Sequence, residues 1–208
     1  YEQGFAISYG WGSASANAID ERDKYQGGGI SYYGSIKNGD SNLIVDVGGY
    51  QVKHDVKGLL KADPKINILT LGITEEYRKQ TGAGSMFVPH IGLRYTYMDT
   101  PAYDGVYNGS TAFRYASQKN HLFTVPVGIG YMRQFNSHGW KYNFAADLSY
   151  IGVLGGQSVS MDVTIPGLNA KDSVSYDVID QSAIKASLGL EAENERIKWG
   201  VNYSFKGS

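Results

Sequence analysis

The stretch Arg196–Ser208, RIKWGVNYSFKGS, alternates between two kinds of residue. From position 197 the odd positions hold Ile, Trp, Val, Tyr and Phe, and the even positions hold Lys, Gly, Asn, Ser and Lys. Successive side chains of a β-strand point to opposite faces, so the segment predicts a strand with one apolar and one polar face. The fold depends on what the apolar face meets: a protein core or the hydrocarbon of a membrane.

The same period of two recurs along the chain, and no segment shows a convincing helical period. Alternating segments include QGFAISYGWG, INILTLGITEEY, MFVPHIGLRYTYM, HLFTVPVGIGYMRQF, GWKYNFAADLSYIG and SAIKASLGLEAE. In NLIVDVGGYQVKH the apolar phase changes at Gly48-Gly49, which predicts a β-bulge there. The pattern predicts an all-β fold in a single domain, residues 1–208.

Short and long connections alternate between these segments. NGDS (38–41), QTGAGS (80–85) and NSHG (136–139) have the composition of tight turns. Longer polar stretches cover 14–24, 57–65 and 99–120. One more strand, expected within 154–182, gives about ten strands and places the C-terminus at the end with the short turns. This alternation is typical of a bacterial outer-membrane barrel, with short periplasmic turns and long outer loops.

The residue types on the two faces favour lipid outside and water inside. The apolar faces carry aromatic residues near their ends and aliphatic residues between them, as in the aromatic girdles of a membrane barrel. A Lys or Arg facing lipid at mid-bilayer would cost about 2–4 kcal/mol, so the charged faces are expected to enclose water. We predict an aromatic girdle of Trp11, Tyr95, Tyr97, Trp140, Tyr142, Tyr150, Trp199 and Tyr203, and a lumen lined by Arg94, Lys141, Asp147, Lys185, Glu191 and Lys198.

Composition narrows the function classes. The formal net charge of −1 gives no indication of nucleic acid as a partner. The chain has no cysteine, so disulfide and thiol chemistry are excluded. No run of about 18 apolar residues predicts a transmembrane helix. The alternative fold is a soluble calycin-like barrel or sandwich, but aromatic residues on every apolar face would overfill such a core.

Three stretches resemble the C-terminal translocator barrel of autotransporters, which belong to type V secretion. They are HIGLRYTYMDTPAYD, VPVGIGYMRQFNSHGWKYNFAADLSYIG and LGLEAENERIKWGVNYSF. The resemblance covers residues 25–206. It implies an antiparallel up-and-down transmembrane β-barrel in the bacterial outer membrane, which supports export of an upstream passenger segment to the cell surface. It also implies that Tyr203 and Phe205 form the signal read by the barrel-assembly machinery, that outer-membrane lipid is a partner, and that no cofactor is needed.

The chain departs from that family pattern in two respects. The family barrel has twelve strands preceded by a helix in the pore, whereas about ten strands and no such helix are evident here. The segment is then either the C-terminal part of a twelve-stranded barrel or a smaller stand-alone barrel, acting as an adhesin or a narrow channel. In addition, Phe205 is followed by Lys-Gly-Ser, although the family's closing aromatic residue is usually the last.

No pattern of catalytic or metal-binding residues stands out. The histidines His54, His90, His121 and His138 lack metal-ligand spacing. His54 adjoins Asp55 at the end of an expected strand, where a surface hydrolase site would lie, and His90, Asp147 and Ser149 supply the residue types of a triad. A solvated ion pair and an ordinary lumen are the simpler interpretations, so we predict no catalytic residue, no metal site and no enzymatic activity.

Overall fold

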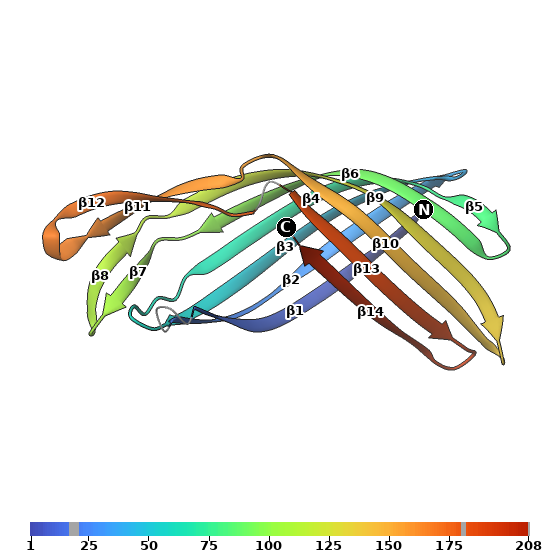
Figure 1. The fold of residues 1–208 in the computed structure, drawn as a ribbon, viewed down its shortest axis with the longest axis horizontal. Helices are drawn as coiled ribbons and strands as arrows, with labels where there is room; N and C mark the ends of the chain where they lie inside the picture. The colour runs from blue at the N-terminus through green and yellow to red at the C-terminus, as the bar shows by residue number, and fades with distance from the viewer. Residues whose placement is uncertain (17–20, 180–181, 208) are drawn as a thin grey trace.

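A curled antiparallel sheet dominates the computed structural model, which describes residues 1–16, 21–179 and 182–207 (Figure 1). Its long strands are β1 (Glu2–Ala16), β2 (Glu21–Asn38), β3 (Ser41–Lys57), β4 (Lys65–Tyr77), β6 (Ser85–Thr100), β9 (Gln118–Ser137), β10 (Trp140–Gly155), β13 (Ser182–Glu193) and β14 (Lys198–Gly207). They pair in that order, and short β5 (Lys79–Gly82) joins the edge of β6. Among the described residues, no helix is long and apolar enough to span a membrane.

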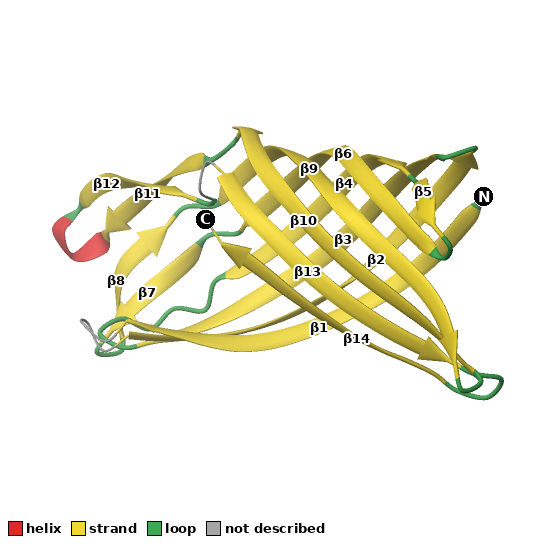
Figure 2. Cartoon of the chain, turned by 45° about the vertical axis from the view of Figure 1, so that its right-hand side comes forward, coloured by secondary structure: helices red, strands yellow, loops and turns green. Residues whose placement is uncertain are grey.

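The sheet curls into half of a barrel (Figure 2). The strands β1 and β14 form its two ends and are not hydrogen-bonded to each other. Every neighbouring pair is antiparallel, so the chain runs up and down as the alternating sequence predicts. The all-β antiparallel fold is thereby confirmed.

The register assigns each side chain to one face of the curled sheet. Phe5, Tyr32, Val47 and Leu71 lie opposite one another along one row, on the face that also holds the apolar residues of the later strands. Large hydrophobic side chains on this convex face are exposed, for example Ile7 at 86%. The other face is concave, so the curvature of the sheet brings its side chains closer together. The buried residues on this face include Ser35, Asn42, Val88, Thr124 and Ser149.

Tight turns join the strands at the end that we call the short-turn end. His138 and Gly139 connect β9 to β10, and both have positive φ, 50° and 78°. Two central residues with positive φ match the twist of a two-residue hairpin turn. His138 therefore occupies a backbone conformation that favours glycine or asparagine, as a turn residue rather than a ligand.

The long connections at the opposite end build a second sheet. It has the order β12-β11-β8-β7, from β7 (Tyr103–Tyr107), β8 (Ser110–Tyr115), β11 (Ser158–Ile165) and β12 (Ala170–Asp177). A 3-10 turn, Pro166–Leu168, lies between β11 and β12. Figure 1 shows this sheet extending beyond the main one.

The second sheet corrects the sequence-based assignment of one strand, although the main sheet has ten strands in all, short β5 included. The strand expected within 154–182 is a hairpin outside the main sheet, because its two eight-residue halves pair with each other while β10 pairs directly with β13. In consequence Gly207 lies opposite Ile184, where the second long connection ends. The expectation that the C-terminus lies at the short-turn end is wrong.

The bulge expected at Gly48-Gly49 is also wrong, since β3 pairs with both neighbours without a register shift. Tyr50 and Val52 lie on the concave face, and the strand does not change face between Val47 and Tyr50. Glycines make room for the Tyr50 ring there: a Cβ added at Gly29 or at Gly48 would collide with it. The change of apolar phase therefore marks an aromatic residue inside the curl and no distortion of the strand.

Candidate functional site: the polar concave face

The six charged residues predicted to line a lumen share the concave face. Register places Arg94 and Asp147 on this face of β6 and β10, and Lys185, Glu191 and Lys198 on the same face of β13 and β14. Lys141 of β10 lies opposite Glu193 of β13, and this position places it on the concave face as well. The period of two fixes which charges share a face, but the contacts between them depend on pairing across strands.

Arg94 and Asp46 form the best-defined ion pair on this face. The Arg94 Nη1 and Nη2 atoms donate to the two carboxylate oxygens of Asp46 at 3.0 and 2.9 Å. The two residues belong to β6 and β3, which are separated by β4, and Gly72 lies opposite both of them. A Cβ on Gly72 would lie 2.9 Å from Arg94 Nη2 and would collide with Asp46. The missing side chain therefore lets the pair close over the middle strand.

A second polar contact uses the same arrangement. His90 of β6 and Ser149 of β10 both lie opposite Gly128 of β9. The distance from His90 Nε2 to Ser149 Oγ is 3.2 Å, and a Cβ on Gly128 would come within 2.6 Å of both side chains. We call these two contacts, Arg94–Asp46 and His90–Ser149, the glycine-spanned bridges.

Asp147 joins the second bridge, yet the three residues do not form a nucleophilic triad. Ser149 Oγ donates to Asp147 Oδ1 at 2.5 Å, and Asp147 Oδ2 lies 3.5 Å from His90 Nε2. In a triad the carboxylate orients the ring nitrogen opposite the one that faces the serine. Here serine and carboxylate meet the same nitrogen, and Nδ1 lies 3.3 Å from the Val88 carbonyl oxygen. The geometry is that of a structural network.

His54 has a different partner from the one its sequence neighbour suggests. Its Nδ1 lies 2.7 Å from Asp23 Oδ2, and both residues face the concave side. Asp55 points to the convex face, where Lys57 Nζ binds its carboxylate at 2.6 Å. Consecutive strand residues face opposite ways, so the sequence-adjacent pair His54–Asp55 does not form.

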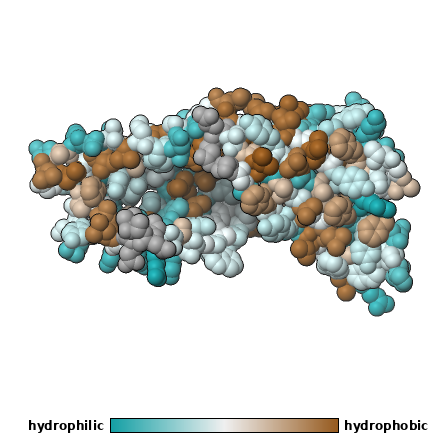
Figure 3. Space-filling model, in the orientation of Figure 1, coloured by the Kyte–Doolittle hydropathy of each residue, from teal (hydrophilic) through white to brown (hydrophobic). Residues whose placement is uncertain are grey.

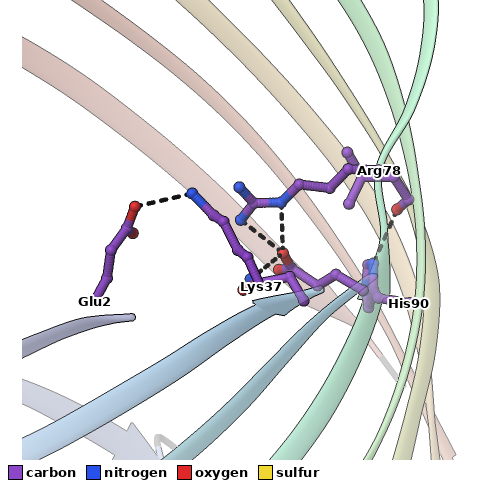
Figure 4. A network of polar contacts seen from close by, with 7 residues as sticks. Glu2, Lys37, Arg78 and His90 are labelled. Carbon is purple, nitrogen blue, oxygen red and sulfur yellow. Dashed lines mark hydrogen bonds and ion pairs between the residues drawn. The ribbon is translucent and has the colours of Figure 1, made fainter. Parts of the chain in front are cut away.

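The short-turn end of the concave face carries another group of contacts (Figure 4). Lys37 Nζ donates to Glu2 at 2.8 Å, and Arg78 donates to Glu76 at 2.9 and 3.2 Å. Asn42, 1% exposed, donates to the same Glu76 carboxylate at 3.2 Å. These contacts tie the starts of β1 and β3 to the ends of β2 and β4.

The later strands are less tightly paired. Lys198 and Glu191 form an ion pair at 3.3 Å with both side chains about half exposed. Within the described part of the chain, no carboxylate lies within 4.0 Å of the ammonium of Lys141 or Lys185. A groove of about 510 Å³ follows this face, and its lining includes His90, Arg94, Asp147, Ser149 and Lys185.

Comparison of the sequence with protein families identifies the family to which this chain belongs. The profile described as "Autotransporter beta-domain" matches residues 3–204, nearly the whole chain. The chain belongs to the autotransporter β-domain family. Members of this family are translocator barrels of the bacterial outer membrane and of type V secretion, so the resemblance of the three quoted stretches is confirmed.

Comparison with solved structures returns the β-domain of the Bordetella autotransporter BrkA. The two chains are 11% identical, with 99% of this chain and 92% of the other covered, at a TM-score of 0.44. Among curated proteins, none matches the sequence. Across the described ranges of this autotransporter β-domain, no group of three or more His, Cys, Asp or Glu side chains is arranged to hold a metal ion.

The predicted girdle residues of this β-domain all lie on the convex face. Trp11, Tyr150, Trp199 and Tyr203 are exposed, at 77%, 53%, 45% and 68%. The other four, Tyr95, Tyr97, Trp140 and Tyr142, are half-buried against their neighbours. In Figure 3 hydrophobic residues gather along the upper rim and over the right-hand strands.

Sequence analysis missed several polar residues of this autotransporter β-domain. Asp46 is a single acidic residue in an apolar segment, and its partner Arg94 lies in another part of the sequence. Glu76 follows Glu75 and has one partner nearby, Arg78, and a distant one, Asn42. The available signal was their phase, because each falls on the polar side of the alternation. Gly72 and Gly128 gave no signal, since a strand glycine is informative only once its cross-strand neighbours are known.

Proposed function

We propose that this β-domain anchors in the outer membrane with its convex face in lipid, and that it supports export of an upstream passenger segment along its polar concave face. The lumen-facing residues are then Arg94, Lys141, Asp147, Lys185, Glu191 and Lys198, and the lipid-facing girdle consists of the eight predicted aromatic residues. The role is mechanical and needs no cofactor or catalytic residue.

The contrast between an apolar convex face and a charged concave face supports this proposal. Exposed aliphatic and aromatic side chains cover the convex face, including Ile7, Leu71 and Val201. Charged side chains on the concave face pair with one another, as Arg94 does with Asp46. Hydrocarbon accepts the first set, and a water-filled interior accepts the second. A soluble protein with this convex face would expose far more apolar surface than monomers tolerate.

Single cysteines test the orientation, because the chain has none of its own. Spin labels are placed at Leu71→Cys and Val201→Cys on the convex face, and at the adjacent positions Thr70→Cys and Asn202→Cys on the concave face. The full chain is reconstituted in phospholipid vesicles. We expect a lipid-dissolved quencher to reach the first two labels and an aqueous quencher to reach the other two. The reverse pattern contradicts the proposal.

Export is tested with a reporter segment fused upstream of Tyr1. Cells that make the fusion are treated with an external protease, and the fraction of reporter that is digested measures surface exposure. We expect exposure to need the β-domain and to fall when bulky residues enter the groove, as in Ser187→Trp. The control Leu188→Trp places the same side chain on the convex face and should leave export unchanged. Equal export in both variants argues against passage along the groove.

Tyr203 and Phe205 remain the proposed signal for the barrel-assembly machinery. Both lie on the convex face of β14, opposite Leu188 and Ala186, and Phe205 is 59% exposed. We expect Phe205→Ser to lower the amount of heat-modifiable β-domain in the outer membrane. The matched control Phe123→Ser alters an aromatic residue on the same face of β9, so an equal loss in both variants shows that only stability was affected.

A second candidate function is attachment to surfaces, and the second sheet favours it. This sheet extends past the main one, and exposed apolar residues such as Leu168 and Tyr107 lie on it. Replacing residues 158–177 by a short Gly-Ser linker should abolish adhesion of cells that display the β-domain, if this is its role, without affecting export of the reporter.

A further inference from the structure

Three lysines on the convex face form a cluster that the proposed translocation role does not use. Lys24, Lys53 and Lys65 lie at the long-connection ends of β2, β3 and β4, and all three side chains are exposed. The register places them on the face that also holds Ile7 and Trp11. We call these three residues the lysine patch.

The arrangement of the lysine patch is electrostatically unfavourable by itself. Lys53 lies directly opposite Lys65, and Lys24 is diagonal to Lys53 because Gln26 is opposite Lys53. Like charges placed directly across two strands destabilise a sheet. In the described ranges no carboxylate lies within 4.0 Å of the three ammonium groups, and Asp55, which lies opposite Lys24, is paired with Lys57 instead. An anion bound between the lysines would remove the repulsion.

The surroundings of the patch form a site of defined size. An open pocket of about 630 Å³ is lined by Lys24, Lys53 and Lys65 together with Trp11, Gln26 and Tyr9, and at its margin by Gly12, Tyr25 and His54. Two carboxylates, Asp55 and Asp63, also line it. Asp55 is engaged by Lys57 at 2.6 Å, and Arg22 shares the convex face, so cations outnumber carboxylates in this area.

The patch lies at the depth where lipid headgroups would be. Trp11, Gln26, Lys53 and Lys65 make one row across β1–β4, and the aliphatic row with Ile7, Ile30 and Leu69 lies four residues inward. Four residues of a strand span about 13 Å, and less across the bilayer because barrel strands are tilted. Trp11 and Tyr9, 77% and 67% exposed, are residue types that favour the membrane–water interface.

We propose that the lysine patch binds the phosphate groups of an anionic lipid in the outer leaflet. The inference rests on the proposed function, since it requires the convex face to meet lipid. Lipid headgroups are the neighbours of this surface in a membrane, and their phosphates carry the negative charge that complements three neighbouring lysines. The chain thereby recruits a shell of phosphorylated lipid on one side, over β2–β4.

The test compares lipid retention by the full chain and two triple variants in mixed detergent–lipid micelles, measured by native mass spectrometry. The probes are lipid A with two phosphates, phosphatidylcholine, and inorganic phosphate as a competitor. One variant carries Lys24→Gln, Lys53→Gln and Lys65→Gln. The matched control carries Lys79→Gln, Lys171→Gln and Lys206→Gln, which removes the same charge elsewhere.

We expect the patch variant to bind lipid A on the order of 100-fold more weakly than the native chain, because each lysine contributes about a fivefold preference near an anionic surface. The control variant and the native chain should agree within about twofold. Equal retention by both variants overturns the proposal, as does equal retention of phosphatidylcholine. Displacement of lipid A by inorganic phosphate at similar concentration identifies a site for free anions and also overturns it.

The orientation experiment with Leu71→Cys and Thr70→Cys separates this inference from the proposed function. If the native chain inserts with its convex face in lipid but the patch variant retains lipid A, the lysine patch is not a lipid site and the proposed function stands. If the convex face of the native chain does not meet lipid, the proposed function itself fails.

Discussion

At the scale of single residues, the side-chain contacts of the concave face depend on which strand positions are glycines. Arg94 and Asp46 come from strands that are not neighbours, and they meet because Gly72 leaves the space between them open. Gly128 does the same for His90 and Ser149. These glycines act through close approach of other side chains, and neither of them has a positive φ.

A side chain at Gly72 should therefore break the first bridge. We expect Gly72→Val to lower the free energy of unfolding by about 1–3 kcal/mol, because the added atoms overlap Asp46 and Arg94. The measurement is urea denaturation in detergent followed by loss of heat-modifiable mobility. Gly49→Val is the control, since a Cβ at Gly49 meets no atom within 4 Å. Equal effects of the two substitutions would contradict the role given to Gly72.

The Asp46–Arg94 pair should contribute measurable coupling energy. Arg94 is 40% exposed and Asp46 23%, so solvent screens the pair and we expect a coupling of about 1–2 kcal/mol, below that of fully buried pairs. The measurement is a double-mutant cycle of Asp46→Asn and Arg94→Gln by the same denaturation assay. A coupling free energy near zero would show that the bridge forms without stabilising the sheet.

At the scale of elements, the second sheet has its own cluster of aromatic and apolar contacts. Tyr103 stacks on Tyr115 with ring centroids 4.6 Å apart, and the side chains of Met161 and Val163 in β11 are buried. The hydroxyl of Tyr176 donates to Gln118 at 2.9 Å, which attaches β12 to the start of β9. An aromatic cluster of this kind responds to pH at the alkaline end of the scale.

Alkaline pH should open the second sheet before the main sheet. Burial raises the pKa of Tyr103 to about 12, and neighbouring Tyr115 and Tyr176 add to the shift. The ionised phenol is disfavoured in the folded state, so the stabilisation is complete below the unfolded pKa of about 10 and is lost as pH rises toward about 12. Near-ultraviolet absorbance of tyrosinate and protease cleavage within 101–117 measure the transition.

The variant Tyr103→Phe keeps the ring and removes the titrating hydroxyl. It should leave the second sheet intact to higher pH than the native residue does. If both proteins are cleaved at the same pH, ionisation of Tyr103 is not what opens the sheet.

The hairpin β11–β12 should be dispensable for the main sheet. We expect replacement of residues 158–177 by a Gly-Ser linker to change the denaturation midpoint of the main sheet only slightly, because β10 and β13 pair directly from Lys141–Glu193 to Gly152–Ser182. Heat-modifiable mobility measures the outcome. Loss of that mobility would mean that the hairpin is needed to bring β10 and β13 together.

The sequence predicted the strands better than it predicted which residues contact one another across them. Alternation identified the long strands and the face of every predicted lumen and girdle residue, because a period of two is a local property. It placed one strand within 154–182 in the barrel, whereas the two halves of that segment pair with each other. The contact between Asp46 and Arg94 and the cluster of Lys24, Lys53 and Lys65 depend on cross-strand register, which no local pattern contains.

At the scale of the whole molecule, the main sheet formed by the described residues has an unpaired strand edge at each end, β1 and β14. The outward backbone groups of β1 and β14 have no partner strand in the curled sheet. Unpaired edges favour addition of another strand, and lipid makes unpaired amides costly. Backbone groups beside Phe5 to Trp11 and beside Trp199 to Phe205 are therefore available for pairing with a further strand.

Hydrogen exchange should reveal these edges. We expect the outward amides of β1 and β14 to exchange faster than those of β4 and β6, which have strands on both sides. The measurement is amide exchange of the full chain in detergent, resolved by fragment mass spectrometry. Protection of β1 and β14 equal to that of β4 would show that the two edges are covered in solution.

The glycine-spanned bridges have one more consequence, for anything that moves along the inner wall. Each one passes close over a strand position that has no side chain, Gly72 or Gly128. At these two bridges the side-chain atoms already contact protein partners, so they offer few vacant donors or acceptors to a polypeptide, unlike the ammonium groups of Lys141 and Lys185. If a passenger segment moves along this face, as we propose, it would pass these two places without being retained there.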